Sequence, residues 1–418
     1  MAPALLVGWA FFPLDEQLEL LAGGVTPRAE ETLVRLASWM PFEAAQELLH
    51  DLLGVQVSPA TARRATLASG EAALSVCERE EERLKQEAPP ASSAADKQAM
   101  SGDGAFVHLV GGEWVEVKSL TLAEVTRNAH GEVCLEQIST FSRLAEAQRF
   151  AEAALVETQR RGVDQASEVC AVQDGAVWLQ GLVDYHCADA VRILDFAHAA
   201  EYVNAIGQAV QAAGDRLPAR WLEGVLHRLK HQGPERVLQH LAFLAAHYPS
   251  SGIQEHLAYL QKREAHMQYP TYQQAGWPIG SGSVESANKV VVEARLKGAG
   301  MRWQGQNVNP MLVLRNAVCN RRWHETWTTA RAHRAALGTQ RRRERSQQRL
   351  IRACWSFVYW ARVQQRAQTP VQTTPSPVAS VGREPLAPRL GAGYSWRQPF
   401  LRRPASFSAR TGEAGAKK

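Results

Sequence analysis

The hydrophobic period of the chain changes near residue 98, and this change constrains the fold more than any other feature. Ahead of it, apolar residues recur at helical spacing, whereas after it β-branched and aromatic residues flank Gly111-Gly112 as in a β-hairpin. The hairpin arms at 98–110 and 113–125 are followed by an expected strand at 132–140, a helix at 142–162, a strand ending at Asp174, a short helix, a strand at 190–196 and helices over 197–265. Three adjoining strands followed by alternating helices and strands predict an α/β fold with a mixed sheet.

Three short helices are expected over 28–75, ahead of the sheet. Gly54 ends the second helix, Ser58 is a strong N-cap for the third, and Pro59 suits the third helix's first turn. The apolar positions that predict the packed faces are Leu33, Leu36, Ala37 and Met40 in the first helix and Phe42, Ala45, Leu48, Leu49 and Leu52 in the second.

The third of these helices carries side chains that suit DNA. Thr61, Arg63 and Arg64 lie in its first turns, after a glycine-led turn, and this arrangement is a helix-turn-helix pattern. Packing of three helices without any DNA contact is the alternative. A charged helix then runs into a Pro/Ala/Ser-rich stretch, so 76–97 is expected to separate two domains.

Basic residues are concentrated toward the end of the chain. Residues 331–418 contain 18 Lys and Arg against 3 Glu, whereas residues 1–330 contain 29 against 39 acidic residues. A polyanionic partner is the natural expectation, and a solvated, disordered charge run is the alternative. The six cysteines lack C-x-x-C spacing, and the longest apolar run near the start is too short to span a bilayer and lacks signal-peptide features. We therefore expect a cytoplasmic protein without a membrane segment.

Two acids adjoin apolar strand sequence. Asp103 and Asp174 each begin the tripeptide Asp-Gly-Ala, which is also a common turn sequence. An acid near the buried centre of a sheet is costly unless it is paired or binds a cation, and two such acids on neighbouring strands repel each other. A divalent ion converts that repulsion into a binding site.

A third acid follows the glycine-serine loop of "GWPIGSGS" at 276–283. Glu285 falls in the first turn of an expected helix, where it can supply a further oxygen ligand to Mg²⁺. Two such ions about 4 Å apart can hold the attacking and leaving oxygens of a phosphoryl displacement. The residues that follow and suit a phosphate backbone are Asn288, Lys289, Arg295, Lys297 and Arg302. The loop itself has no nucleotide-binding motif.

Five stretches carry a resemblance to a known family. They are "FPLDEQLEL", "GDGAFVHL", "VQDGAVWL", "ILDFAHAAEYV" and "GSGSVESANKVVVEARLKGAGMRW". Together they resemble the transposases of bacterial insertion sequences in the DDE superfamily, most closely the ISKra branch, over about residues 11–325. The resemblance implies an RNase H-like catalytic core whose metal-binding triad is Asp103, Asp174 and Glu285, with a helical insertion between the second Asp and the Glu.

The same resemblance implies supporting residues. Asp195 and His198 are similar to an Asp/Cys-x-x-His motif that related transposases carry between the second Asp and the Glu, and Trp303 belongs to the terminal motif. Taken alone, His198 is as well explained as a satisfied structural histidine, and Trp303 as a core or cap tryptophan. Relatives also carry a cysteine-rich, ribbon-like segment ahead of the "FPLDE" stretch.

The expected protein is a DNA transposase. Two Mg²⁺ or Mn²⁺ ions would serve phosphodiester hydrolysis and then strand transfer at terminal inverted repeats, in a homo-oligomer on double-stranded DNA at the bacterial nucleoid. A catalytically inactive or truncated DNA-binding derivative is one alternative, and a structure-selective nuclease of the same fold is another. The expected domains are an N-terminal remnant (1–27), a helix-turn-helix domain (28–75), a linker (76–97), the first part of the core (98–200), a helical insertion (201–270), the core helix with the catalytic Glu (271–325), a basic helical extension (326–366) and a disordered basic tail (367–418).

Overall fold

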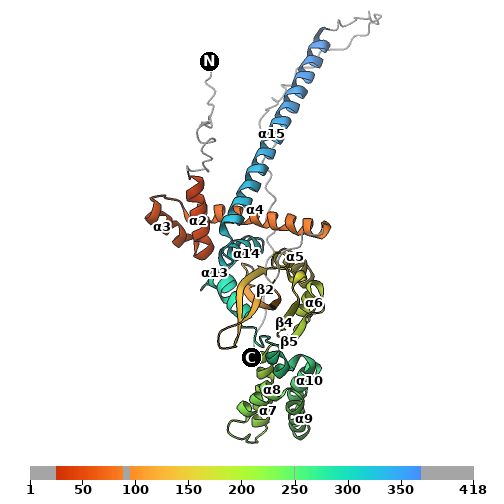
Figure 1. Cartoon of the computed structure of the whole chain (residues 1–418). Coiled ribbons are helices and arrows are strands. Elements are labelled where there is room, and N and C mark those ends of the chain that lie inside the picture. The colour runs from red at the N-terminus through yellow and green to blue at the C-terminus, as the bar shows by residue number, and fades with distance from the viewer. Residues whose placement is uncertain (1–24, 88–94, 249, 369–418) are drawn as a thin grey trace, which may run out of the picture. The chain divides into compact units, whose positions relative to one another are not determined.

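The computed structural model describes residues 25–87, 95–248 and 250–368. The chain divides into two compact units, Met1–Gln348 and Arg349–Lys418, and the elements discussed below belong to the first (Figure 1). The predicted remnant at 1–27 and the predicted tail at 367–418 fall almost wholly outside the described residues. The predicted basic extension at 326–366 lies within one helix, α15 (Trp323–Gln368). None of the helices in the described part of the chain is long and apolar enough to cross a membrane.

A five-stranded mixed sheet forms the centre of the first unit, which confirms the predicted α/β class. Its order is β3-β2-β1-β4-β5, with β1, β2 and β3 antiparallel and with β4 and β5 parallel to β1. The strands are β1 (Lys97–His108), β2 (Trp114–Arg127), β3 (Val133–Arg143), β4 (Glu168–Gln173) and β5 (Val191–Leu194). All five lie where the hydrophobic pattern predicts them.

Two helices cover one face of the sheet. They are α5 (Ala147–Arg160) and α6 (Val177–His186), which Figure 1 shows next to each other, with α6 beside β4. Phe150 of α5 and Leu179 of α6 are fully buried against Met100 of β1 and Leu122 of β2. A short 3₁₀ turn, η1 (Val163–Gln165), leads into β4.

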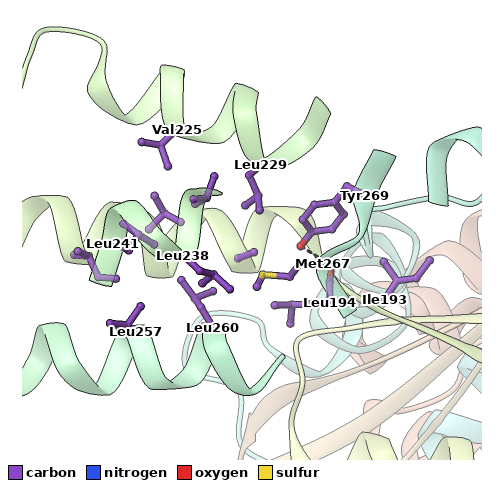
Figure 2. Packing of buried hydrophobic residues seen from close by; sticks show 14 of the residues in the cluster. Ile193, Leu194, Val225, Leu229, Leu238, Leu241, Leu257, Leu260, Met267 and Tyr269 are labelled. Carbon is purple, nitrogen blue, oxygen red and sulfur yellow. Dashed lines mark hydrogen bonds between the residues drawn. The ribbon is translucent and has the colours of Figure 1, made fainter. Parts of the chain in front are cut away.

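A group of helices shares a second core with the sheet. Its members are α7 (Phe196–Ala212), α8 (Trp221–Gln232), α9 (Glu235–His247), α10 (Ser251–Lys262), the 3₁₀ turn η2 (Glu264–Met267) and α11 (Tyr269–Gln274). Figure 2 shows Leu229, Leu241 and Leu260 of three of these helices meeting in one apolar cluster that extends to Leu194 of β5. Tyr269 closes the cluster by donating a hydrogen bond to the Leu194 carbonyl at 3.0 Å. The segment predicted as a helical insertion is therefore helical and is packed on the end of the sheet.

The exposed edge of β3 is covered by asparagine side chains. Helix α14 (Gly305–Cys319) and its C-cap present Asn309, Asn316 and Asn320 to the strand. Each amide both donates to and accepts from the backbone of one residue of β3 or its end, at 2.8–3.2 Å; the residues paired in this way are Leu144, Ser142 and Thr140. The N–H and C=O groups that an edge strand leaves free are thereby satisfied.

We expect Asn316→Ala to lower the free energy of unfolding by about 2–3 kcal/mol, because the buried N–H and C=O of Ser142 both lose their partner. Urea unfolding followed by tryptophan fluorescence measures this loss. Asn307→Ala is the matched control, since the Asn307 amide of the same helix donates only to Gln304. Equal urea midpoints for the two variants would show that the asparagine contacts do not hold the edge.

Three helices precede the sheet: α2 (Pro27–Trp39), α3 (Phe42–Leu53) and α4 (Pro59–Gln86). Gly54 ends α3 in the left-handed conformation, and the Ser58 hydroxyl accepts from the Thr61 N–H at the start of α4, both as predicted. Two expectations differ from the structure. Leu52 is 63% exposed rather than packed, and α4 is not short but continues as one helix through the charged sequence at 77–86.

Two buried arginines join α2 to the helices that follow the glycine-serine loop. Arg295 donates from Nε to the Ala37 carbonyl at 2.8 Å, and Arg315 donates from Nη1 to the Ser38 carbonyl at 2.9 Å. The last carbonyls of a helix lack partners within the helix and carry partial negative charge, and α2 has no basic residue in its own last turn. The cations that satisfy this helix end therefore come from residues more than 250 positions away in the chain.

Candidate active site

Asp103, Asp174 and Asp195 lie at one level of the sheet. Asp103 lies on β1, and Asp174 and Asp195 directly follow the neighbouring parallel strands β4 and β5. The register pairs Ser101 of β1 with Val172 of β4, so the same offset places Asp103 level with Asp174, just past the end of β4. The pairing of Gln173 with Leu194 places Asp195 level with Asp174 in turn. Neighbouring strands are about 4.8 Å apart, so these backbones are adjacent.

Asp103 occupies a polar gap between two apolar clusters on one face of β1. Side chains of alternate residues share a face. On this face Ala99 joins the helical cluster, whereas Ala105 and Val107 join a separate cluster with Val291. The polar side chains between the clusters belong to Ser101, Asp103 and, from the neighbouring β2, Ser119 and Thr121.

The helix that carries Glu285 lies over this polar gap. Helix α12 (Gly282–Ala287) places the Ser283 hydroxyl 3.1 Å from the hydroxyl of Thr121. Its N-cap, Ser281, donates from its hydroxyl to the buried Asp195 carboxylate at 3.0 Å. Asp195 therefore fixes the start of the helix four residues ahead of Glu285, whose side chain is exposed.

Asp103, like Asp174, is half-buried. Its Oδ1 accepts from the Gly104 N–H at 2.7 Å, and its Oδ2 accepts from Asn288 Nδ2 at 2.8 Å. Burial raises the pKa of Asp103, the two hydrogen bonds lower it, and the nearby Asp174 and Glu285 carboxylates raise it further. Asp174 and Glu285, the other two acids predicted as a triad, are thus each near enough to Asp103 to act on its pKa.

Their carboxylates do not form a closed ligand set in this conformation. Over the residues that the structure describes, no group of three or more His, Cys, Asp or Glu side chains is arranged to hold a metal ion. The donors that are present, hard carboxylate oxygens, are those that Mg²⁺ and Mn²⁺ prefer.

No protein-family model matches this chain, and no curated protein does so either. The assignment of a function therefore depends on the chain's own residues and geometry.

An unpartnered oxygen accompanies the acids. Asn288 is 5% exposed, and because a carboxylate only accepts hydrogen bonds, its Nδ2 must be the atom that faces Asp103. Its Oδ1 is buried without a hydrogen-bond partner among the described residues. The sequence grouped Asn288 with phosphate contacts, whereas the structure places it inward, on the carboxylate.

Asn288 opens a turn of π-helix, η3 (Asn288–Glu293), between α12 and the short α13 (Ala294–Leu296). A π-turn displaces backbone hydrogen bonds, and such turns are frequent at functional sites. Arg315 binds two carbonyls here, donating from Nε to Val291 at 3.1 Å and from Nη2 to Val290. The helix predicted after the glycine-serine loop is thus divided into three short segments, α12, η3 and α13. The buried Arg315 guanidinium binds the middle segment.

The loop after Asp174 is fixed by side chains of the helical insertion. Asp174 Oδ1 accepts from the Ala176 N–H at 2.8 Å, Tyr259 donates to the Asp174 carbonyl, and Arg263 Nη2 donates to the Gly175 carbonyl at 2.8 Å. Gly175 has a φ of +83°, and a Cβ there would lie 2.8 Å from the Tyr259 hydroxyl. The glycine of this Asp-Gly-Ala therefore has a positional role beyond that of a simple turn.

We expect Gly175→Ala to reduce any activity that depends on Asp174 by about tenfold or more, because the methyl group must displace Tyr259 or Arg263 and the backbone is strained. Gly181→Ala in α6 is the control, since a Cβ there meets open space and alanine favours a helix. Circular dichroism checks that both variants fold. An unchanged metal affinity and DNA cleavage rate in Gly175→Ala would refute the positional role.

The residues of the predicted supporting motifs are structural in their contacts. Asp195 caps α7 by accepting from the Ala197 N–H, in addition to holding Ser281. His198 lies 3.5 Å from Glu201 and packs edge-on against Tyr202 and Tyr259, the tyrosine that holds the Asp174 loop.

Trp303 is buried in the cluster that adjoins Asp103. Its backbone N–H donates to His108 at 3.0 Å, and its ring meets Phe42 edge-on. These contacts are those of the core tryptophan considered as the alternative. Its indole Nε1 has no hydrogen-bond partner among the described residues.

The predicted DNA contacts fall into two groups. Lys289, Arg302, Arg63 and Arg64 are exposed, Thr61 is half-buried beside Arg64, and Lys297 is exposed but paired with Glu293 at 2.8 Å. Arg295 differs: it is 2% exposed, its guanidinium lies 4.8 Å from the Phe42 ring centre, and burial lowers its pKa to about 10. Arg295 is enclosed and donates to the Ala37 carbonyl, so its guanidinium is not available to a phosphate. We therefore exclude Arg295 from the expected DNA contacts.

Sequence reasoning missed Tyr259, Arg263, Ser281 and Arg315, which hold the acid-bearing segments in place. Ser281 could have been recognised locally, because it lies in the glycine-serine loop four residues ahead of Glu285, where a serine suits a helix N-cap. The other three act across distances in the chain that no local pattern reveals.

Proposed function

We propose that this protein is a metal-dependent DNA transposase whose catalytic residues are Asp103, Asp174 and Glu285. The proposal is supported by the register that makes Asp103 and Asp174 level on neighbouring strands and by the packing of the helix of Glu285 over the same polar gap. Both of the other carboxylates contribute to the raised pKa of Asp103. Among the described residues Asp103 has no basic partner, and its oxygens accept only from an amide and a backbone N–H.

An RNase H-like core and a helix-turn-helix are part of the proposal. Three antiparallel strands followed by two parallel strands, with acids on the first and fourth, support the former. A glycine-ended α3, a short turn and a capped α4 with exposed Arg63 and Arg64 support the latter.

Asp103, Asp174 and Glu285 would hold Mg²⁺ or Mn²⁺, and the unpartnered Asn288 Oδ1 adds a fourth oxygen nearby. When bound, such ions polarise a phosphate and lower the pKa of an attacking water or 3′-hydroxyl. The chain's own part is positional. Asn288 and the Gly104 N–H orient the two oxygens of Asp103, the Tyr259–Arg263 pair fixes the Asp174 loop, and Asp195 fixes the helix of Glu285. Exposed Lys289 and Arg302 would bind the DNA backbone beside the gap.

We expect Asn288→Ala to weaken Mn²⁺ binding by about tenfold, as loss of a residue that orients a metal ligand does. The Asn288 hydrogen bond lowers the pKa of Asp103, so its removal raises that pKa, and the pH at half-maximal Mn²⁺ binding should move upward. Calorimetric titration of Mn²⁺ across pH measures both effects. An unchanged midpoint and affinity would show that Asn288 does not act on the metal site.

Incubation with linear DNA that carries the sequences flanking the gene, in which the proposal expects terminal inverted repeats, in Mg²⁺ and in EDTA, tests the function. The proposal predicts Mg²⁺-dependent 3′-end cleavage followed by strand-transfer product. A gel shift without cleavage would instead identify a DNA-binding derivative, and cleavage without joining would identify a nuclease. We also propose that the protein acts as a homo-oligomer on DNA, since two element ends must be joined. A location at the nucleoid follows from the same proposed activity.

A further inference from the structure

A small cavity lies beside β3, where α4, α5, α14 and the start of α15 meet that strand. Its volume is about 80 Å³, which exceeds the roughly 10–15 Å³ that one water needs. Three arginines and one glutamate are the charged residues that line it: Arg143, Arg160, Arg322 and Glu157.

Two of these arginines are already neutralised. Arg322 makes a two-pronged ion pair with Glu157, at 2.6 and 2.9 Å, and Arg160 Nη1 contacts both oxygens of Glu325 at 2.8 Å.

Arg143 is not neutralised in this way. It is 6% exposed, and its Nε and Nη1 have no hydrogen-bond partner among the described residues. Its guanidinium lies 5.3 Å from the Phe141 ring centre, a contact that supplies no hydrogen-bond acceptor. A buried charge without a hydrogen-bonded counter-charge is strongly unfavourable.

The neighbouring acids do not supply that counter-charge. Glu81 is engaged by Arg149 and by Lys85, and Glu78 is exposed and makes no ion pair with Arg143 in the described structure. Cys77 also lines the cavity, but burial raises the pKa of its thiol, so the thiol stays protonated at neutral pH.

We propose that the cavity binds one small free oxyanion of the phosphate or sulfate class on Arg143. A guanidinium presents planar N–H donors that match the oxygens of such an anion. The hydroxyls of Thr140 and Thr326, which also line the cavity, can donate to it. The anion would join β3 to four helices and so stabilise their junction. This site is separate from the acid cluster and does not depend on the proposed function.

Calorimetric titration of inorganic phosphate into the full chain, at constant ionic strength in sodium chloride, tests the proposal. The wild type should bind one phosphate per chain, Arg143→Met should bind at least tenfold more weakly, and Arg236→Met, which removes an exposed arginine of α9, should match the wild type. Arg143→Lys keeps the charge without the planar donors and should also bind more weakly, which covers the case in which Arg143→Met does not fold.

A second readout is the alkylation rate of Cys77, followed by peptide mass mapping. Phosphate should slow this rate in the wild type, and a higher phosphate concentration should be needed for the same slowing in Arg143→Lys. Absence of saturable binding in the wild type, or equal affinity in Arg143→Lys, would overturn the proposal in favour of a cavity that holds only water. Displacement of the phosphate by a short DNA duplex would overturn the assignment to a free anion.

Discussion

Asp103→Asn, Asp174→Asn and Glu285→Gln are each expected to reduce Mg²⁺-dependent DNA cleavage by about a thousandfold or more while leaving end-binding within about twofold. Each amide keeps the shape of the side chain but removes the charge that would bind the cation. Cleavage of end-labelled DNA and gel-shift affinity on the same preparations separate the two effects.

Asp184→Asn is the control for these variants. Asp184 is an exposed acid of α6 that is paired with Arg192, so its loss should leave cleavage unchanged. A variant of Asp103, Asp174 or Glu285 that cuts at the wild-type rate would remove that residue from the catalytic assignment.

Arg315→Met is expected to lower the free energy of unfolding by about 3–5 kcal/mol, because three backbone carbonyls, two of them in buried hydrogen bonds, lose a charged donor together. Methionine preserves the apolar stem of the side chain but removes the guanidinium, which also lies 4.4 Å from the Trp39 ring centre, so the change removes the hydrogen bonds together with this cation–π contact. Urea unfolding followed by fluorescence gives the value.

Arg302→Met is the matched control, since Arg302 is exposed and its loss should change the free energy of unfolding by no more than about 0.5 kcal/mol. Arg315→Met should also weaken Mn²⁺ binding, because Val290 and Val291 follow directly on the segment that carries Glu285 and Asn288. A loss of stability below about 1 kcal/mol would show that the π-turn does not depend on this guanidinium.

The strands could be predicted because their signals are local. Alternating β-branched and aromatic residues mark β1 and β2, and the apolar runs before Asp174 and Asp195 mark β4 and β5. The sequence placed Asp103 and Asp174 in or at the end of strands, whereas the parallel pairing of β1 with β4 that makes them neighbours is seen only in the structure.

The end of α4 could not be predicted in the same way. Ser69-Gly70 looks like the end of a helix, but Gly70 lies in the interior of α4 and faces α14, where a Cβ would lie 2.7 Å from the Pro310 carbonyl carbon. The glycine is required by the close approach of two helices that are far apart in the chain. No local pattern distinguishes that role from a helix stop.

The role of Arg295 was missed for a related reason. A basic residue in a helix that follows a candidate catalytic acid suits phosphate. The sequence alone does not say whether its side chain points to solvent or into the core. The π-turn of η3 changes the rotation of the residues after it, and the end of α2 offers carbonyls to the side that Arg295 occupies. Asn288, the first residue of this turn, likewise faces Asp103 instead of solvent.

The central claim, that three distant acids share one cation site, is tested most directly by Fe²⁺-dependent hydroxyl-radical cleavage of the protein backbone. Fe²⁺ bound in place of Mg²⁺ should cut the chain near residues 103, 174 and 285 together, and excess Mg²⁺ should suppress all three cuts. Cuts near only one of these positions, or none that Mg²⁺ suppresses, would contradict a shared site.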